Sequence, residues 1–153
     1  MFYFVKRALG SIACLLITTC PACAFTFSYG SLLNISDVQV QDGIIRLPLT
    51  QKKYRNIKIL SRQVYQFLKE CEQDCYYPQA GQAFDIGDVR RARTNEQMLI
   101  AAVAINRDIE ITFLIFKNKN GFSIKTPDVV QFKDERLRRE IKKALLERAR
   151  QIL

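Results

Sequence analysis

The chain has 153 residues, with 24 Lys and Arg against 15 Asp and Glu, and it contains no histidine. Its length excludes a large multidomain protein, and its net charge of +9 favours anionic partners such as nucleic acid, lipid head groups or an acidic protein. The lack of histidine excludes Ser-His and Cys-His nucleophile pairs and His-ligated metal sites, and no motif predicts a cofactor.

The first 24 residues have the order of a secretory signal peptide. Lys6 and Arg7 precede an apolar stretch over about residues 8–19, and the small-residue site Ala22-Cys23-Ala24 follows. Pro21 interrupts the apolar stretch before it reaches the roughly 20 residues of a membrane-spanning helix, so an uncleaved anchor is the weaker interpretation. We expect cleavage after residue 24 and an exported protein, periplasmic or secreted.

The expected mature chain contains two cysteines, Cys71 and Cys75. Two cysteines in an oxidising compartment favour one disulfide. Side chains four residues apart in an intact helix run in parallel and close poorly into a disulfide, so a bridge requires a helix that ends near Cys71. A redox pair, part of a metal site and free thiols are the alternatives.

The segment 25–78 is expected to form a partial β-β-α module. Residues 35–40 indicate a strand, Asp42-Gly43 a turn, and the alternation at 45, 47 and 49 a second strand. A β-rich run at 54–60 leads to Ser61, which can cap a helix with an apolar face made of Val64, Phe67, Leu68 and Cys71. Residues 72–82 have no clear period and are interpreted as a connector.

The segment 79–153 is expected to form a β-β-β-β-α module. Residues 84–93 and 97–105 indicate strands, and apolar residues alternate along a third at Ile109, Ile111, Phe113 and Ile115. Asn120-Gly121 predicts a tight hairpin into residues 122–124. Asp134 can cap a helix whose apolar face carries Leu137, Ile141, Ala144, Leu145 and Ile152. The predicted fold class is therefore α+β, an antiparallel sheet with amphipathic helices.

The two segments share a weak internal repeat of strand, turn glycine, strand, proline and amphipathic helix. Gly43 and Pro48 in the first segment correspond to Gly121 and Pro127 in the second. A duplicated module and a coincidence both fit this pattern.

Residues 84–150 carry a family resemblance. Ile86-Gly87-Asp88-Val89-Arg90 looks like an opening strand, the residues 120–127 like a glycine, strand and proline, and the residues 132–149 like a helical end of the SpoVG (stage V sporulation protein G, septation protein) family. Residues 35–70 resemble a partial second copy. The resemblance implies a small nucleic-acid-binding dimer with a role in septation, and here either a homodimer or an intrachain pseudo-dimer.

Eight basic residues form the candidate binding surface: Arg90, Arg91 and Arg93 on a strand, and Arg136, Arg138, Arg139, Lys142 and Lys143 on the last helix. A solvated helix side with Glu140 and Glu147 is the alternative interpretation. The carboxylates match no catalytic or calcium-loop spacing, and no metal site is predicted.

We therefore expect an exported, non-enzymatic SpoVG-like binding module of the cell envelope that acts on an envelope protein or an anionic surface. A nucleic-acid-binding SpoVG-type regulator is the alternative.

Overall fold

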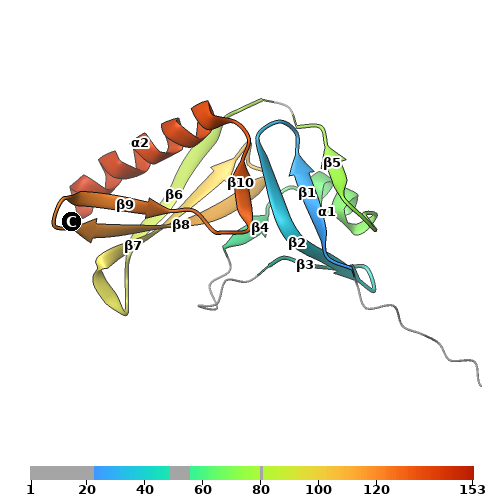
Figure 1. The fold of residues 1–153 in the computed structure, drawn as a ribbon, viewed down its shortest axis with the longest axis horizontal. Coiled ribbons are helices and arrows are strands. Elements are labelled where there is room, and N and C mark those ends of the chain that lie inside the picture. Colours follow the sequence, from blue (N-terminus) through green and yellow to red (C-terminus); the bar gives the residue numbers. More distant parts are fainter. Residues whose placement is uncertain (1–22, 49–55, 80) are drawn as a thin grey trace, which may run out of the picture.

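The computed structural model describes residues 23–48, 56–79 and 81–153, and it confirms the α+β fold class. Two sheets dominated by antiparallel pairs lie beside each other, and the long helix α2 (Glu135–Ile152) runs along one side of the second sheet (Figure 1). Residues 1–22 of the predicted signal peptide, residues 49–55 and residue 80 lie outside the described residues. No helix among the described residues is long and apolar enough to cross a membrane.

The first sheet has the strand order β10-β2-β1-β5, with β3 paired to β2. Its strands are β1 (Phe25–Tyr29), β2 (Leu33–Gln41), β3 (Ile44–Arg46), β5 (Cys75–Tyr77) and β10 (Val130–Phe132). The short helix α1 (Arg62–Lys69) packs near this sheet, and its Phe67 ring contacts Phe27 and Tyr77. All pairs are antiparallel except β1 with β5.

The second sheet has the strand order β4-β8-β7-β6, with β9 paired to β8. Its strands are β4 (Ile57–Ile59), β6 (Phe84–Ala92), β7 (Asn95–Ile105), β8 (Ile109–Asn118) and β9 (Gly121–Lys125). Every pair in it is antiparallel. The alternating apolar residues of β8 lie on the buried face, because successive side chains of a strand point to opposite faces.

The local signals in the sequence predicted both helix caps and both hairpins. The β8–β9 turn lies one residue earlier than expected, because Gly121 pairs with Asn118 and residues 119 and 120 form the turn. Asp42 and Gly43 have φ values of 53° and 70° in the β2–β3 turn. Ser61 caps α1 by accepting a hydrogen bond from the Val64 N–H at 3.5 Å. Asp134 caps α2 by accepting the N–H groups of residues 136 and 137 at 2.9 and 3.0 Å.

Three short strands were not predicted. The expected connector at residues 72–82 contains β5, which pairs in parallel with β1, and β1 and β10 also lie where no strand was expected. Strands β5 and β10 have three residues each, which is too short to show a period of two. Their pairing partners are distant in sequence, so local pattern could not indicate them.

Each half of the chain contributes one strand to the sheet of the other half. Strand β4 precedes α1 and pairs with β8, whereas β10 precedes α2 and pairs with β2. The sequence β2-β3-β4-α1 of the first half therefore has its counterpart in β8-β9-β10-α2 of the second. The two predicted segments are not separate in space, because their sheets share these exchanged strands.

The hydrogen bonds at the two exchanges are equivalent. The N–H groups of residues 60 and 61 donate to the Asp108 carbonyl at 2.7 and 3.2 Å, and those of residues 133 and 134 donate to the Leu32 carbonyl at 2.8 and 3.2 Å. The Thr112 N–H donates to the Asn56 carbonyl at 2.8 Å, and the Ser36 N–H to the Val129 carbonyl at 2.9 Å. The two halves thus have matching strand orders and matching exchange contacts, an arrangement with an approximate two-fold relation.

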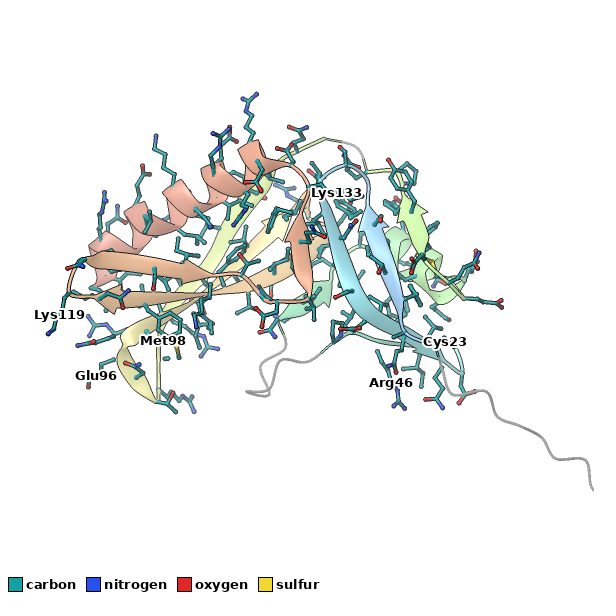
Figure 2. The ribbon with its side chains drawn as sticks, in the orientation of Figure 1. Cys23, Arg46, Glu96, Met98, Lys119 and Lys133 are labelled. Atoms are coloured by element: carbon teal, nitrogen blue, oxygen red, sulfur yellow. A yellow bond between two sulfur atoms is a disulfide. The ribbon has the colours of Figure 1, made fainter. Side chains whose placement is uncertain are left out.

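A single buried cluster contains side chains of both halves. Its members on α2 are Leu137, Ile141, Leu145 and Ala149, and they share the cluster with the buried residues of β8. Phe113 is in this core, and Phe122 packs against it. Phe116 instead packs against Met98 and Ile100 in a second cluster. Met98 lies on the side of the sheet away from α2 (Figure 2).

Candidate functional site

Three cations lie on one outward-facing stripe of α2. Arg139, Lys143 and Arg150 are four and seven residues apart, which places them on one side of a helix with 3.6 residues per turn. The opposite side is buried, so these side chains are exposed. Within the described part of the chain none of them makes an ion pair or a side-chain hydrogen bond. This stripe of Arg139, Lys143 and Arg150, about 16 Å long, is called the outward stripe below.

Two other arginines of α2 are paired with carboxylates of the same helix. Arg136 Nε lies 2.9 Å from Glu140 Oε1, and Arg138 Nη1 lies 2.8 Å from Glu135 Oε1. The hydrogen bond to Glu140 raises the pKa of Arg136. The solvated-helix interpretation therefore describes these two residues well, because their charge is offset locally. Its second carboxylate, Glu147, is exposed between Lys143 and Arg150 on the outward side of α2 and forms no ion pair within the described residues.

Strand alternation separates the arginines of β6. Arg90 pairs across the sheet with Ile100 and lies on the side away from α2, where its Nε is 3.3 Å from Asp88. Arg91 lies on the α2 side, and its Nη2 donates to the Ile152 carbonyl at 2.7 Å. Arg93 follows at the exposed β6–β7 turn. The eight predicted residues thus lie on more than one surface.

The last turn of α2 contains the cation that the sequence analysis missed. Arg150 extends the line begun by Arg139 and Lys143, whereas Lys142 lies half-buried on the flank of the helix. The spacing of four and seven residues was visible in the sequence. Arg150 lies outside the denser basic run of residues 136–143, so that run did not indicate it.

The cysteine pair forms a disulfide, as predicted. The α-carbons of Cys71 and Cys75 are 6.2 Å apart, within the usual range for a disulfide. Helix α1 ends at Lys69 and its C-cap is Glu70, so the two cysteines do not share a helix. The bridge connects the end of α1 to the start of β5.

Asp85 and Asp74 each make a single contact. Asp85 lies 3.5 Å from Arg107, and Asp74 Oδ1 accepts the Thr26 N–H at 2.7 Å. Across the described ranges, no three Cys, Asp or Glu side chains are grouped as metal ligands.

No protein-family model, curated protein or solved structure matches this chain. The resemblance of residues 84–150 to the SpoVG family stays a prediction.

Proposed function

We propose that this protein is an exported, non-enzymatic binding module of the cell envelope that attaches to an anionic surface through α2. The observation that supports this function is the outward stripe, whose three cations have no acidic partner among the described residues. The paired Arg136 and Arg138 provide the contrast within the same helix. Charges that are already neutralised contribute little to binding, so the stripe is the part of α2 available to a ligand.

The shape of the stripe favours a flat anionic surface. Arg139, Lys143 and Arg150 project from one side of a helix whose opposite side is anchored in the core, so all three can meet a plane at the same time. Each basic residue near an anionic membrane surface contributes about 1 kcal/mol. Salt screens these contacts, so binding should weaken as ionic strength rises.

The test is cosedimentation of the mature, disulfide-bonded protein with vesicles of phosphatidylglycerol and phosphatidylcholine. We expect the wild type to bind, and Arg139→Ala/Lys143→Ala/Arg150→Ala to lose about tenfold or more in affinity. The matched control is Arg46→Ala/Arg62→Ala/Lys69→Ala, which removes the same charge from exposed positions of the first half. We expect the control to bind as the wild type does.

Two results would overturn the proposal. An equal loss in both triple variants would show that net charge alone drives binding. Tighter, stripe-dependent binding to duplex DNA than to the vesicles, at physiological salt, would favour the SpoVG-type nucleic-acid function, whose salt dependence follows the number of phosphates neutralised. Cell fractionation with N-terminal sequencing tests export separately, and Met1 retained on the native protein would contradict it.

A further inference from the structure

A polar cavity of about 580 Å³ opens on the face of the first sheet that is turned away from the core. Eight of its lining residues carry hydrogen-bonding side chains, among them Thr26, Asn34, Ser36, Asp128, Gln131 and Arg138. Strands β1 and β2, the segment around β10 and the first turns of α2 all contribute to it. The volume is within the range of sites for small ligands.

A row of four side chains crosses this face in register. Tyr76 of β5 is the partner of Ser28, Ser28 of Asn34, and Asn34 of Gln131. Neighbouring strands are about 4.8 Å apart, so the row is about 14 Å long. It begins at an aromatic ring that is 58% exposed and ends in the cavity. From Ser28 to Gln131 it presents one hydroxyl and two amides and no charge, and the Ser28 hydroxyl donates to Asn34 Oδ1 at 2.9 Å.

An irregularity in β2 lies beside the cavity. The β1–β2 register shifts between Phe25 and Phe27, and Asp37 has a φ of 59°, a conformation that residues other than glycine rarely adopt. Such bulges redirect side chains and are common next to functional sites. Here the bulge places Ser36 on the cavity wall together with Thr26.

The approximate two-fold of the fold provides an internal comparison. The cross-strand pair Asn34 and Gln131 corresponds to Glu110 and Lys58 in the second sheet. There, Lys58 Nζ and Glu110 Oε1 form an ion pair of 2.6 Å over a smaller hollow of about 330 Å³. In the described residues, no such side-chain contact joins Asn34 to Gln131. The ion pair that joins β4 to β8 in the second sheet therefore has no counterpart between β10 and β2 in the first sheet.

The rim of the cavity adds groups that suit polyhydroxyl ligands. Asp128 is exposed and makes no side-chain hydrogen bond or ion pair among the described residues. Arg138 has one side-chain contact, with Glu135, and a guanidinium carries five N–H donors. A carboxylate and a guanidinium with spare capacity can each engage two neighbouring hydroxyl groups.

We propose that this face binds an extended, uncharged glycan chain. The hydroxyl and amide groups of the row match the hydroxyl and acetamido groups of sugars, and the Tyr76 ring offers an apolar surface for the C–H face of a sugar ring. Asp128 and Glu135 at the rim disfavour an anionic ligand. The central strands β1 and β2 offer no free edge to a peptide strand, because both of their edges are already paired.

The test is titration of the mature, disulfide-bonded protein with two uncharged tetrasaccharides, chitotetraose and cellotetraose, by calorimetry and by amide chemical shifts. Asn34→Glu/Gln131→Lys installs the ion pair of the second half in the first, so a folded variant is expected. We expect this double variant and Tyr76→Ala each to weaken binding by about tenfold. Tyr65→Ala removes an exposed tyrosine of α1 as the control and should leave binding unchanged.

Each outcome decides the proposal. Binding of chitotetraose alone supports recognition through acetamido groups, and binding of cellotetraose, alone or in addition, supports recognition through hydroxyls. The proposal fails if neither sugar binds to the wild type. It also fails if both variants bind as the wild type does, or if the shifted amides lie on α2 rather than on β1, β2 and β10.

Discussion

Tyr29 donates a hydrogen bond to the carboxylate of Asp108, although the two residues are 79 positions apart. Asn106 Nδ2 donates to the same phenol oxygen at 3.2 Å and to the Gly81 carbonyl at 3.1 Å. Asn106 and Arg107 both have positive φ in the β7–β8 turn, at 50° and 60°. The Tyr29 hydroxyl therefore fixes β1 of the first half against a turn of the second half.

Removal of this hydroxyl should destabilise the fold. Tyr29 is fully buried, so Tyr29→Phe leaves Asp108 and Asn106 without a partner at that point. An unsatisfied buried polar group costs about 1–3 kcal/mol. We expect a loss of that size in the free energy of unfolding by urea, and none for Tyr76→Phe, whose ring is exposed. A neutral Tyr29→Phe would show that water replaces the hydroxyl.

The pKa of Tyr29 predicts how the free energy of unfolding changes at alkaline pH. Burial, and then the hydrogen bond to Asp108, raise the pKa of Tyr29 well above its ordinary value of 10. When folding raises the pKa of a group, the group contributes its full stabilisation at pH values below its pKa in the unfolded chain. That stabilisation declines as the pH rises above about 10. We expect the difference in stability between wild type and Tyr29→Phe to shrink above pH 10, and a constant difference up to pH 12 would contradict this.

The buried and exposed sides of α2 should respond differently to truncation. Leu145 is 0% exposed in the shared core, so Leu145→Ala should cost about 2–5 kcal/mol. Arg138 is partly exposed and paired only with Glu135, so Arg138→Ala should cost less than about 1 kcal/mol. Denaturant unfolding of both variants checks this. A neutral Leu145→Ala with a severe Arg138→Ala would reverse the assignment of the two sides.

Local chemistry explains which elements were predictable from the sequence. Ser61 and Asp134 identify two helix starts, and Gly43 and Gly121 identify two hairpins, because each of these roles depends on neighbouring residues alone. The alternation along β8 identified its buried face for the same reason. The exchange of β4 and β10 depends on which distant strands meet, and no local pattern contains that information.

The candidate site was predictable only in part. The basic run on α2 was visible in the sequence, but only the structure shows that Arg136 and Arg138 are neutralised and that Arg90 and Arg91 point to opposite sides of the sheet. The polar row was not predictable, because β5 and β10, which hold its two ends, are far in the chain from the β1–β2 pair between them. Tyr76 in particular lies in the segment that was expected to be a connector.

The disulfide should stabilise the protein modestly. Cys71 and Cys75 enclose a loop with a sequence separation of four, and by the loop-length model a loop this short stabilises by about 2 kcal/mol or less. We expect no thiol labelling of either cysteine in protein isolated without reductant. Reduction should lower the urea midpoint slightly and loosen β5 first. Full labelling of both cysteines in the native protein would contradict the bridge.

The exchanged strands predict that the two halves unfold together. Ile57 of β4 belongs to the first half, is 3% exposed and pairs with Ile111 of β8. Ile57→Ala should therefore destabilise both sheets by the same amount, about 2–5 kcal/mol. Ile44→Ala provides the control, because Ile44 is 58% exposed at the edge of the first sheet.

Native-state hydrogen exchange measures the two sheets separately in the same sample. In Ile57→Ala, the protection of the β1–β2 amides and of the β7–β8 amides should fall in parallel, because neither sheet keeps its full set of strands when the other opens. A loss confined to one sheet would show two independent units. In that case the sequence boundary near residue 78 would also be a boundary of folding, despite the shared core.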